Sequence, residues 1–476
     1  MQAADSGLSG VQRLRADFRQ RGQDHVFRFW NGLEPDERER LAAQASRVDF
    51  GLLDRALARA GEPPQIDAET IQPAPVEALP EHGGNGAERE TARQRGEELL
   101  RAGRVGVLVV AGGQATRLGR SGPKGLFPLG PVSSRSLFAQ QAQKLRHLRD
   151  RCGHPVPWLV MTSPATDTPT REAFSSNDYF GLPAEDVLFF CQGSVPSVDF
   201  QGRLMLERAD RIFESPDGHG GAILALRDSG VLAEMQQRGI DLLFFYQVDN
   251  PLVRLGDPLF IGFHALRDAE MSCKVIRKRN AGESVGVVVQ IGEQVGILEY
   301  TEIADAQRVA RDAQGALLYW AGNAAMHVFN VDFLSRVAAD AEALLPLHPS
   351  QKKIPTLDNS GTPLSPDSPN GYKLERFIFD ALLAARRVCV VEVRREEEYS
   401  PVKNAEGPDS PETARQDLET RYRAWLSEAG LPAPSERDSL EIDESRISGP
   451  EELRALGVEG LANADEVMLT SPGAKA

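Results

Sequence analysis

The spacing of apolar residues changes near residue 105 of the chain. Before it, apolar side chains recur at intervals of three or four, as in Val11, Leu14 and Phe18, which predicts short helices over residues 8–60 and a further helix over 88–102. From Val105 onward, β-branched and aromatic runs predict buried strands at residues 105–110, 155–162, 187–190, 241–249, 273–276, 285–291 and 387–393. Helical spacing between several of these runs predicts helices at residues 136–149, 224–238, 258–269 and 372–385.

Strands that alternate with helices predict an α/β fold with a largely parallel sheet covered on both faces. The later apolar runs alternate less regularly, so a mixed or antiparallel part is expected as well. Residues 61–90 are rich in proline and glycine and indicate a linker, or a strap lying over another domain. A helix over residues 414–429 is followed by a polar tail. We therefore expect three regions: a helical N-terminal region with linker (1–95), a catalytic domain (96–403) and a small acidic C-terminal region (404–476).

Charge is unevenly distributed over the 476 residues, whose formal net charge is −15. Residues 61–100 hold nine acidic and three basic residues, and residues 404–476 hold 16 acidic and seven basic. Residues 101–403 are nearly neutral, with 35 acidic and 34 basic residues. An acidic chain without a basic stripe is a poor binder of nucleic acid or anionic membrane. The neutral middle can still bind a small anion, and the acidic flanks are expected to serve solubility.

Cysteine spacing and hydropathy argue against further classes of protein. The four cysteines lack CxxC spacing, which argues against a zinc site or a disulfide framework. The first residues lack the apolar stretch of a signal peptide, and no run of about 18 apolar residues is present. We expect a soluble cytoplasmic protein with no membrane partner.

The strongest local motif is the stretch VLVVAGGQATRLGRSGPKG at residues 107–125. A buried strand runs into Gly112 and Gly113, and ligands of α/β sheets bind beyond the carboxyl ends of strands. Paired glycines let backbone N–H groups approach a phosphate or a base edge, while Arg117 and Lys124 supply positive charge for a polyphosphate. The stretch is neither a Walker A loop nor a GxGxxG dinucleotide fingerprint. It indicates a nucleotide site of another kind.

A carboxylate follows a second buried strand. Asp249 ends the run DLLFFYQVD and precedes Asn250-Pro251. Mg²⁺ prefers oxygen ligands and often takes only one or two carboxylates together with substrate phosphates. Asp249 is therefore the candidate metal ligand, with Mg²⁺ as the expected cofactor and Mn²⁺ as the alternative.

The motif GGxxTRLGxxxPKG resembles the signature of UDP-N-acetylhexosamine pyrophosphorylases. Further segments agree in order over residues 10–430, among them FFCQG, SPDGHGG, YQVDNPLV, SVGVV, LEYTE, AGNAAMHVFN, PNGYKLERFIFD and REEEYSPVKNAEG. The resemblance implies a Rossmann-like, GT-A-like nucleotidyltransferase fold, with a mixed sheet flanked by helices. It also implies that UTP and a sugar 1-phosphate, most plausibly N-acetylglucosamine 1-phosphate, give a UDP-sugar and pyrophosphate.

The sugar phosphate oxygen attacks the α-phosphate in line in such a reaction, so catalysis rests on positioning and charge neutralisation. By the resemblance, Arg117 and Lys124 act on the leaving group and Lys403 reaches the phosphates. Gln192 and Gly218 match positions that recognise uracil. The remaining expected nucleotide contacts are Val110, Ala111, Gly112, Gly113 and Asp249.

The expected sugar site combines polar and aromatic residues: His219, Gly286, Glu299, Tyr300, Asn323, Lys373 and Phe377, with Phe379 nearby. Close eukaryotic relatives usually have Asn at the position of His219, so UDP-glucose, UDP-galactose or broad UDP-sugar synthesis is the alternative at the level of substrate. His327 is expected to be a packed structural histidine. A non-catalytic sugar-nucleotide sensor is the alternative of another class, but a degenerate member should have lost Arg117, Lys124, Asp249 or Lys403.

Overall fold

The computed structural model describes residues 10–60, 70–300, 302–435, 437–462 and 467–470. By their internal contacts they form two compact units, each described here by itself. The N-terminal unit comprises Met1–Gln65, Gly193–Gly221 and Ala341–Ile378, and the sheet unit comprises Ile66–Gln192, Ala222–Asp340 and Phe379–Ala476. The boundaries at residues 95 and 403 expected from composition stay a prediction.

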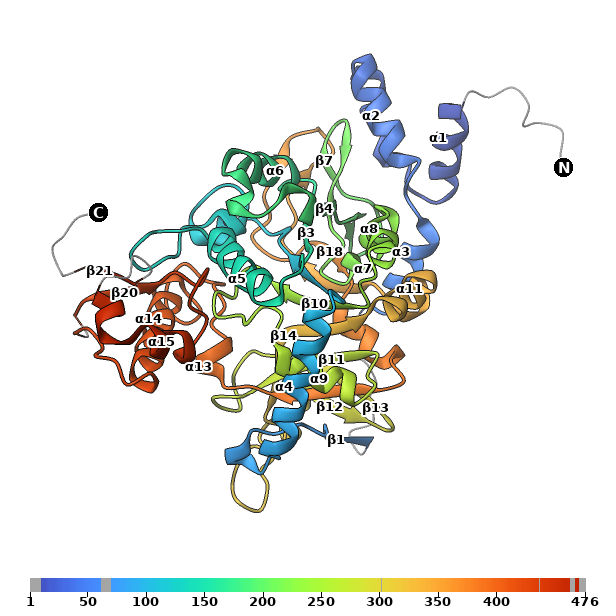
Figure 1. The fold of residues 1–476 in the computed structure, drawn as a ribbon. Coiled ribbons are helices and arrows are strands. Elements are labelled where there is room, and N and C mark those ends of the chain that lie inside the picture. The colour runs from blue at the N-terminus through green and yellow to red at the C-terminus, as the bar shows by residue number, and fades with distance from the viewer. Residues whose placement is uncertain (1–9, 61–69, 301, 436, 463–466, 471–476) are drawn as a thin grey trace. The chain divides into compact units, whose positions relative to one another are not determined.

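The sheet unit is built on a ten-stranded sheet (Figure 1). Four neighbouring strands in its path run parallel, in the order β10-β2-β3-β4. They are β10 (Leu242–Gln247), β2 (Val105–Val110), β3 (Trp158–Thr162) and β4 (Val187–Cys191). The apolar runs of β10, β2 and β3 are almost wholly buried and that of β4 is partly buried, which fits the strands that the sequence predicted.

The other strands make the sheet mixed. Strand β14 (Ala321–Asn330) runs antiparallel to β10 and also pairs β11 (Met271–Arg277) and β12 (Val287–Ile291). The periphery is formed by β1 (Ile71–Pro73), β13 (Gln294–Leu298) and β19 (Val388–Glu392). Because β1 pairs β12, and Glu77 donates its N–H to the carbonyl of Val390, this part of the proline-rich stretch is a strap rather than a free linker.

Helices flank the sheet as expected (Figure 1). Helices α4 (Gly86–Arg101) and α9 (Pro258–Leu266) lie side by side, and a Cβ on Gly96 would stand 1.8 Å from the carbonyl oxygen of Pro258. Before residue 340, this unit also contains α5 (Leu137–Cys152), α6 (Asp167–Ser176), α7 (Gly221–Asp228), α8 (Val231–Gln237), α10 (Asp305–Arg308) and α11 (Val331–Ala339). The single helix predicted over residues 224–238 is wrong, since Gly230, at φ +80°, separates α7 from α8.

The end of the chain belongs to the sheet unit and is more structured than its composition indicated. It contains α13 (Arg395–Glu398), α14 (Pro411–Glu428), β20 (Ser439–Ile442), α15 (Pro450–Ala462) and β21 (Val467–Thr470), with β20 and β21 antiparallel. Leu440, Ile442 and Leu453 are buried in the main core. The expectation of a polar tail after residue 431 is therefore wrong for this part.

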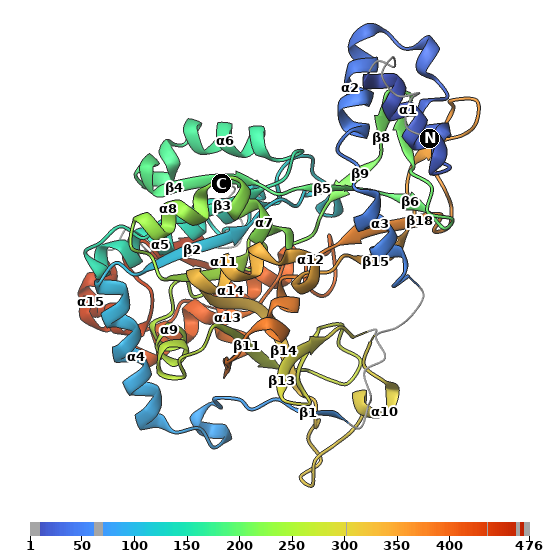
Figure 2. The ribbon, with the colours of Figure 1, turned by 90° about the vertical axis from the view of Figure 1, so that its right-hand side faces the viewer.

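The N-terminal unit packs helices on small sheets (Figure 2). Its helices are α1 (Gly10–Gln20), α2 (Pro35–Ala45), α3 (Phe50–Leu57) and α12 (Ala341–Leu344). Its strands are β5 (Ser194–Pro196), β6 (Val198–Asp199), β7 (Leu206–Arg208), β8 (Arg211–Ile212), β9 (Glu214–Pro216), β15 (His348–Lys352), β16 (Thr356–Leu357), β17 (Pro363–Leu364) and β18 (Gly371–Glu375). Phe18, Phe27 and Leu41 share its buried core, as their helical spacing predicted.

One predicted helix is a strand instead. Residues 372–385 were expected to be helical, but β18 pairs both β15 and β6, and a 3₁₀ turn (Ile378–Ala384) follows. Pairing with strands distant in sequence overrides local helical spacing here. Gly371 permits this pairing, because a Cβ on it would stand 2.4 Å from the carbonyl oxygen of Val198.

The sequence also argued against a zinc site, a disulfide framework and a membrane-spanning segment. No disulfide joins any of the four cysteines, all of which lie in the described part of the chain. Among the helices of the described residues, none has the length and apolar character needed to cross a membrane.

Candidate active site

The glycine-rich loop leaves the sheet at the end of β2. The N–H of Ala111 still bonds the carbonyl of Met161 at 2.9 Å, so the loop begins in register with β3. A Cβ on Gly112 would lie 2.6 Å from Nε2 of Gln192 and 3.2 Å from Cβ of Ser163. Nothing lies within 4 Å of the corresponding position on Gly113. Glycine at 112 thus allows the Gln192 amide to lie directly against the loop.

The two basic residues of the motif come from a closed loop. Lys124 donates its N–H to the carbonyl of Gly113, and Ala115 donates to Gly122, both at 2.9 Å. Arg117 lies in a 3₁₀ turn (Thr116–Leu118), and its side chain is exposed. The loop therefore presents one exposed guanidinium and one partly buried ammonium group.

Lys124, Asp249 and Lys403 converge at the carboxyl end of β10. Nζ of Lys124 lies 3.2 Å from Oδ2 of Asp249 and 3.4 Å from the carbonyl oxygen of Val402. The N–H of Val402 in turn donates to the carbonyl of Asp249 at 2.9 Å. Oδ1 of Asp249 is buried without a hydrogen-bond partner. Three residues that the sequence placed far apart thus meet in one cluster.

The charge of Lys403 is favoured by its surroundings. Its Nζ lies 3.4 Å from the hydroxyl of Tyr399. Burial opposes the charged form, but Tyr399, Asp249 and Asp409 outweigh this and raise the pKa of Lys403. The ammonium group is therefore held charged and ready for an anion.

Buried polar residues that the sequence analysis missed support this cluster. The side chain of Asn250 donates to the carbonyl of Glu398 at 2.7 Å and accepts from the N–H of Ser400 at 3.1 Å. The Glu398 carboxylate pairs with fully buried Lys274, which also lies 2.7 Å from Asp257. Burial favours the neutral acid at Asp257, but Lys274 and Arg254 outweigh it and lower its pKa to about 2. The sequence signal for such an ion pair is Lys274, a lysine within the apolar run CKVI.

Four of the predicted sugar residues lie in the sheet unit. The N–H of Asn323 donates to the carbonyl of Gly286 at 2.8 Å, and a Cβ on Gly286 would stand 3.2 Å from Oε1 of Glu299. Tyr300 is 47% exposed. Strand β14 begins near Asn323 and runs antiparallel to β10, so its start lies at the same end of the sheet as Asp249. The strand pairing thus places Asn323 and its neighbours at the same end of the sheet as the charged cluster.

His219, Lys373, Phe377 and Gly218 lie in the N-terminal unit, whereas Phe379 begins a segment of the sheet unit. His219 stacks on Phe377 with ring centroids 5.6 Å apart, and its Nδ1 accepts the N–H of Ile378 at 3.0 Å. Burial, assisted by His348, lowers the pKa of His219 to about 4, so the imidazole is neutral and carries its proton on Nε2. A Cβ on Gly218 would lie 2.5 Å from the carbonyl oxygen of Arg376. The loop is therefore tightly fixed against the end of β18.

Two further ionisable side chains of the N-terminal unit, Lys373 and Asp217, have shifted pKa values. Nζ of Lys373 lies over the ring of Phe213 at 5.1 Å, and burial lowers its pKa. Asp217, which the sequence analysis did not select, is buried with Oδ1 lacking a hydrogen-bond partner, and burial raises its pKa to about 7. Two residues of SPDGHGG, Asp217 and His219, thus have strongly shifted titration, which marks functional sites more often than ordinary loops.

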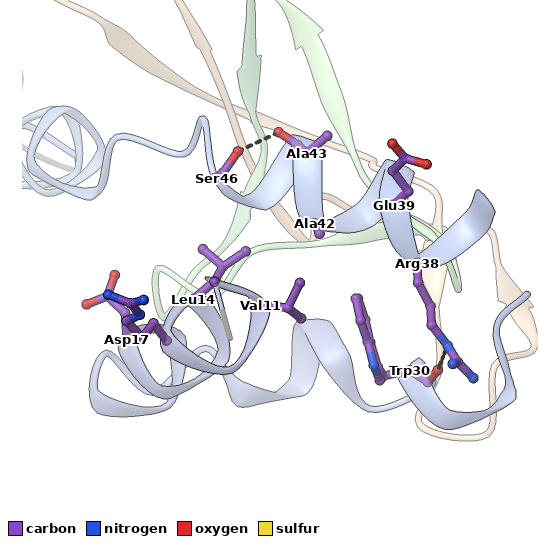
Figure 3. A pocket seen from close by; sticks show the side chains of 11 residues that line it. Val11, Leu14, Asp17, Trp30, Arg38, Glu39, Ala42, Ala43 and Ser46 are labelled. Atoms are coloured by element: carbon purple, nitrogen blue, oxygen red, sulfur yellow. Dashed lines mark hydrogen bonds between the residues drawn. The ribbon is translucent and has the colours of Figure 1, made fainter. Parts of the chain in front are cut away.

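An apolar pocket of about 830 Å³ lies between α1 and α2 in the N-terminal unit (Figure 3). Val11, Leu14 and Trp30 point into it, and Arg38 donates to the carbonyl of Trp30 at its edge. None of the predicted site residues lines this pocket. This pocket is therefore separate from the predicted site residues.

His327 is fully buried between Phe245 and Phe329, which confirms its structural role. Within the described residues, no group of three or more His, Cys, Asp or Glu side chains could hold a metal ion. Any metal bound at Asp249 must therefore take most of its ligands from substrate and water.

Comparisons with known proteins agree with this geometry. The family model described as UTP--glucose-1-phosphate uridylyltransferase matches residues 49–408. The "UDP-N-acetylhexosamine pyrophosphorylase-like protein 1" of Homo sapiens is 40% identical over 441 residues, covering 89% of this chain and 87% of the human protein. The "UDP-N-acetylglucosamine diphosphorylase 2" of Arabidopsis thaliana is 35% identical, covering 88% of this chain and 85% of the plant protein.

A solved structure gives the same result. The uridine diphosphate N-acetylglucosamine pyrophosphorylase from Trypanosoma brucei, in complex with inhibitor, superimposes with a TM-score of 0.77 at 28% identity, covering 89% of this chain and 87% of that chain. The fold, the glycine-rich loop and the charged cluster define a nucleotidyltransferase. The chain belongs to the UTP–glucose-1-phosphate uridylyltransferase family, and among the proteins of that family it is similar to the UDP-N-acetylhexosamine pyrophosphorylases.

Proposed function

We propose that this enzyme transfers the uridylyl group of UTP to N-acetylglucosamine 1-phosphate, giving UDP-N-acetylglucosamine and pyrophosphate. The observation that carries the proposal is the meeting of Lys124, Asp249 and Lys403 at the end of β10. Positive groups and one buried carboxylate, beside a loop with exposed backbone, suit a polyphosphate substrate.

The reaction needs little proton transfer from the protein. A phosphate monoester oxygen of the sugar phosphate attacks the α-phosphorus, and the bond to pyrophosphate breaks on the opposite side. Arg117 and Lys124 offset the negative charge that collects on the leaving pyrophosphate. Lys403, whose raised pKa keeps it charged, offsets the charge of the α-phosphate and the incoming sugar phosphate. Positioning and charge neutralisation then account for the rate.

The residues present fit a magnesium ion. Oδ1 of Asp249 is buried without a hydrogen-bond partner, and it is an oxygen ligand of the kind that Mg²⁺ prefers. A single carboxylate suffices because Mg²⁺ usually keeps several waters and binds substrate phosphates. When bound, Mg²⁺ or Mn²⁺ stabilises negative charge on phosphate oxygens. Asp249 would hold the ion through Oδ1, while Nζ of Lys124 lies 3.2 Å from its other carboxylate oxygen, Oδ2.

Uracil recognition is assigned to Gln192 and Gly218. The Gln192 amide lies against Gly112 and offers both a donor and an acceptor, which can pair with the edge of a pyrimidine. The N–H of Gly218 is held in a fixed turn at φ +85°. The remaining assigned nucleotide contacts, Val110, Ala111, Gly112 and Gly113, supply backbone along the loop.

The sugar is assigned to His219, Gly286, Glu299, Tyr300, Asn323, Lys373 and Phe377. Glu299 can accept hydrogen bonds from sugar hydroxyls, and Asn323 can donate and accept. The neutral His219 can donate from Nε2 to a carbonyl or a hydroxyl oxygen. The names of the similar human and plant proteins favour an N-acetylated sugar, and UDP-glucose or broad UDP-sugar synthesis is the alternative that His219 keeps open.

Two further proposals concern the type of sheet and the cellular location of the protein. We propose that the mixed sheet is of the Rossmann-like, GT-A-like type, which the parallel strands around β2 and the nucleotide loop beyond them support. We also propose a cytoplasmic location, which the scattered spacing of the four cysteines favours because disulfide frameworks are typical of oxidising compartments.

The test is a substrate panel. Pyrophosphate release from UTP and Mg²⁺ is measured with N-acetylglucosamine, N-acetylgalactosamine, glucose and galactose 1-phosphates, and kcat/KM is compared. The proposal expects the highest kcat/KM with N-acetylglucosamine 1-phosphate. A preference for glucose 1-phosphate would select the alternative substrate, and no release with any sugar while UTP still binds would select a sensor.

A further inference from the structure

The acidic C-terminal region contributes two buried carboxylates to the sheet unit. Glu441 at the end of β20 is 2% exposed, and Glu444, three residues on, is 6% exposed. Figure 1 shows the elements of this region gathered beside α5, and the ion pair between Lys144 and Glu444 joins them to that helix. A charge buried to this extent must be compensated by hydrogen bonds or opposite charges, so its partners show what it holds.

Glu441 holds the loop that follows Lys124. Its Oε2 accepts the N–H groups of Val132 and Ser133, both at 2.8 Å, and its Oε1 accepts the hydroxyl of Ser133 at 2.6 Å. Three hydrogen bonds to one ionised carboxylate form a strong anchor. The loop is also packed tightly, since a Cβ on Gly130 would stand 2.9 Å from Oε1 of Glu441.

This anchored loop continues directly into the turn that carries Lys124. The N–H of Phe127 bonds the carbonyl of Lys124 at 2.9 Å, and the N–H of Leu137 bonds the carbonyl of Phe127 at 3.1 Å. Arg415 on α14 adds a second hold, donating to the carbonyls of Pro128 and Leu129 at 3.1 and 3.2 Å. The C-terminal region therefore holds the path from Lys124 to α5 at residues 128–129 and 132–133.

Glu444 holds the loop that follows Asp249, through two cations. Its Oε1 accepts from Nη2 of Arg421 at 2.6 Å, and its Oε2 lies 3.7 Å from Nζ of Lys144. Nη1 of Arg421 donates to the carbonyl of Leu252 at 2.9 Å, and Lys144 donates to the carbonyls of Pro251 and Val253. The two basic side chains described on these three carbonyls, Arg421 and Lys144, thus share one carboxylate.

We propose that Glu441 and Glu444 are positioning residues for uridylyl transfer: the C-terminal segment 441–444 fixes the loop of Lys124 through Glu441 and the loop of Asp249 through Glu444. The inference rests on the proposed function, because it assigns these two loops to the leaving pyrophosphate and to the metal. It assigns the acidic C-terminal region a role in the geometry of the reaction in addition to solubility.

The test compares Glu441→Gln, Glu444→Gln and the control Glu428→Gln in the full chain. Glu428 is an exposed acid of α14, so its substitution should leave all constants unchanged. Glu444→Gln should raise the Mg²⁺ concentration for half-maximal rate about tenfold, as the loss of one charge-assisted hydrogen bond predicts. Glu441→Gln should raise KM for pyrophosphate in the reverse reaction by about the same factor without changing the Mg²⁺ dependence.

The two separate effects, one on the Mg²⁺ requirement and one on KM for pyrophosphate, distinguish a positioning role from a general loss of folding stability. A merely structural role would lower the active fraction and the Tm, and it would move neither the Mg²⁺ requirement nor KM for pyrophosphate. Restoration of the Mg²⁺ dependence by Glu444→Asp would support the proposal. If Glu441→Gln does not fold, Ser133→Ala removes one of the same hydrogen bonds and should raise KM for pyrophosphate in the same direction.

Two failures are distinguishable. Wild-type protein that binds UTP but releases no pyrophosphate with any sugar phosphate would refute the proposed function. Active wild-type enzyme together with folded Glu441→Gln and Glu444→Gln variants of unchanged Mg²⁺ dependence and KM would refute the positioning role alone.

Discussion

Replacement of Gly112 with alanine tests the nucleotide loop most sharply. The new Cβ would lie 2.6 Å from Nε2 of Gln192, whereas ordinary contact begins at 3.4 Å, so the amide must retreat by about 0.8 Å. The loop itself has little room to shift, because the new Cβ would also lie 3.2 Å from the Cβ of Ser163. The substitution therefore displaces the group assigned to uracil while leaving the charged cluster in place.

The expected effect follows from the hydrogen bonds at stake. A neutral hydrogen bond contributes about 0.5–1.5 kcal/mol, so the loss of two to the base costs roughly 2 kcal/mol, or about 30-fold in Kd for UTP. The methyl group also overpacks the loop, at a cost of about 1–3 kcal/mol in folding stability. We expect weaker UTP binding and poorer discrimination between UTP and CTP.

The assay is isothermal titration of UTP and CTP into Gly112→Ala and into Gly86→Ala. Gly86, the first residue of α4, has nothing within 4 Å of the position that a Cβ would take, and it serves as the matched control. A folded Gly112→Ala protein that binds UTP as tightly as the wild type would refute the assignment of Gln192 to the base.

Two further predictions concern Asp249 and His219. Asp249→Asn should lower kcat by about 100-fold or more, because it removes the negative charge that is assigned to the metal, and a kcat near normal at ordinary Mg²⁺ would contradict that assignment. The pKa of His219 is lowered by burial from 6.5 to about 4, so the unfolded chain takes up this proton first and stability falls as the pH drops from 6.5 toward 4. His219→Asn should make Tm less sensitive to pH in that window, and an unchanged slope of Tm against pH would contradict the buried neutral histidine.

The central strands and the nucleotide loop could be predicted because their signals are local. The run from Val105 to Val110 is buried on both faces, and Gly112 and Gly113 follow it without interruption. Likewise, Asp249 was recognisable as a carboxylate at the end of a long apolar strand. Its meeting with Lys124 and Lys403 follows from the parallel order of β2 and β10 and from the return of the chain after β19.

Other features depend on contacts distant in sequence. Strand β14 was not predicted because its alternation is weak, and its position beside β10 becomes visible only from pairing. The helix expected over residues 372–385 failed for the same reason, since β15 and β6 impose a strand on Gly371–Glu375. Glu441 and Glu444 resembled solvated acids in an acidic tail, because their partners lie about 300 residues away or on another helix.

The most direct test of the central claim is a single-turnover measurement with UTP, Mg²⁺ and N-acetylglucosamine 1-phosphate. Wild-type enzyme should form pyrophosphate and UDP-sugar in equal amounts. Lys403→Met should do so about 100-fold or more slowly, with a larger effect on the rate than on Kd for UTP, because the lysine is assigned to the α-phosphate and to the sugar phosphate, whose charges come together only as the reaction proceeds. Product formation by Lys403→Met at the wild-type rate, or none by the wild type, would contradict the account.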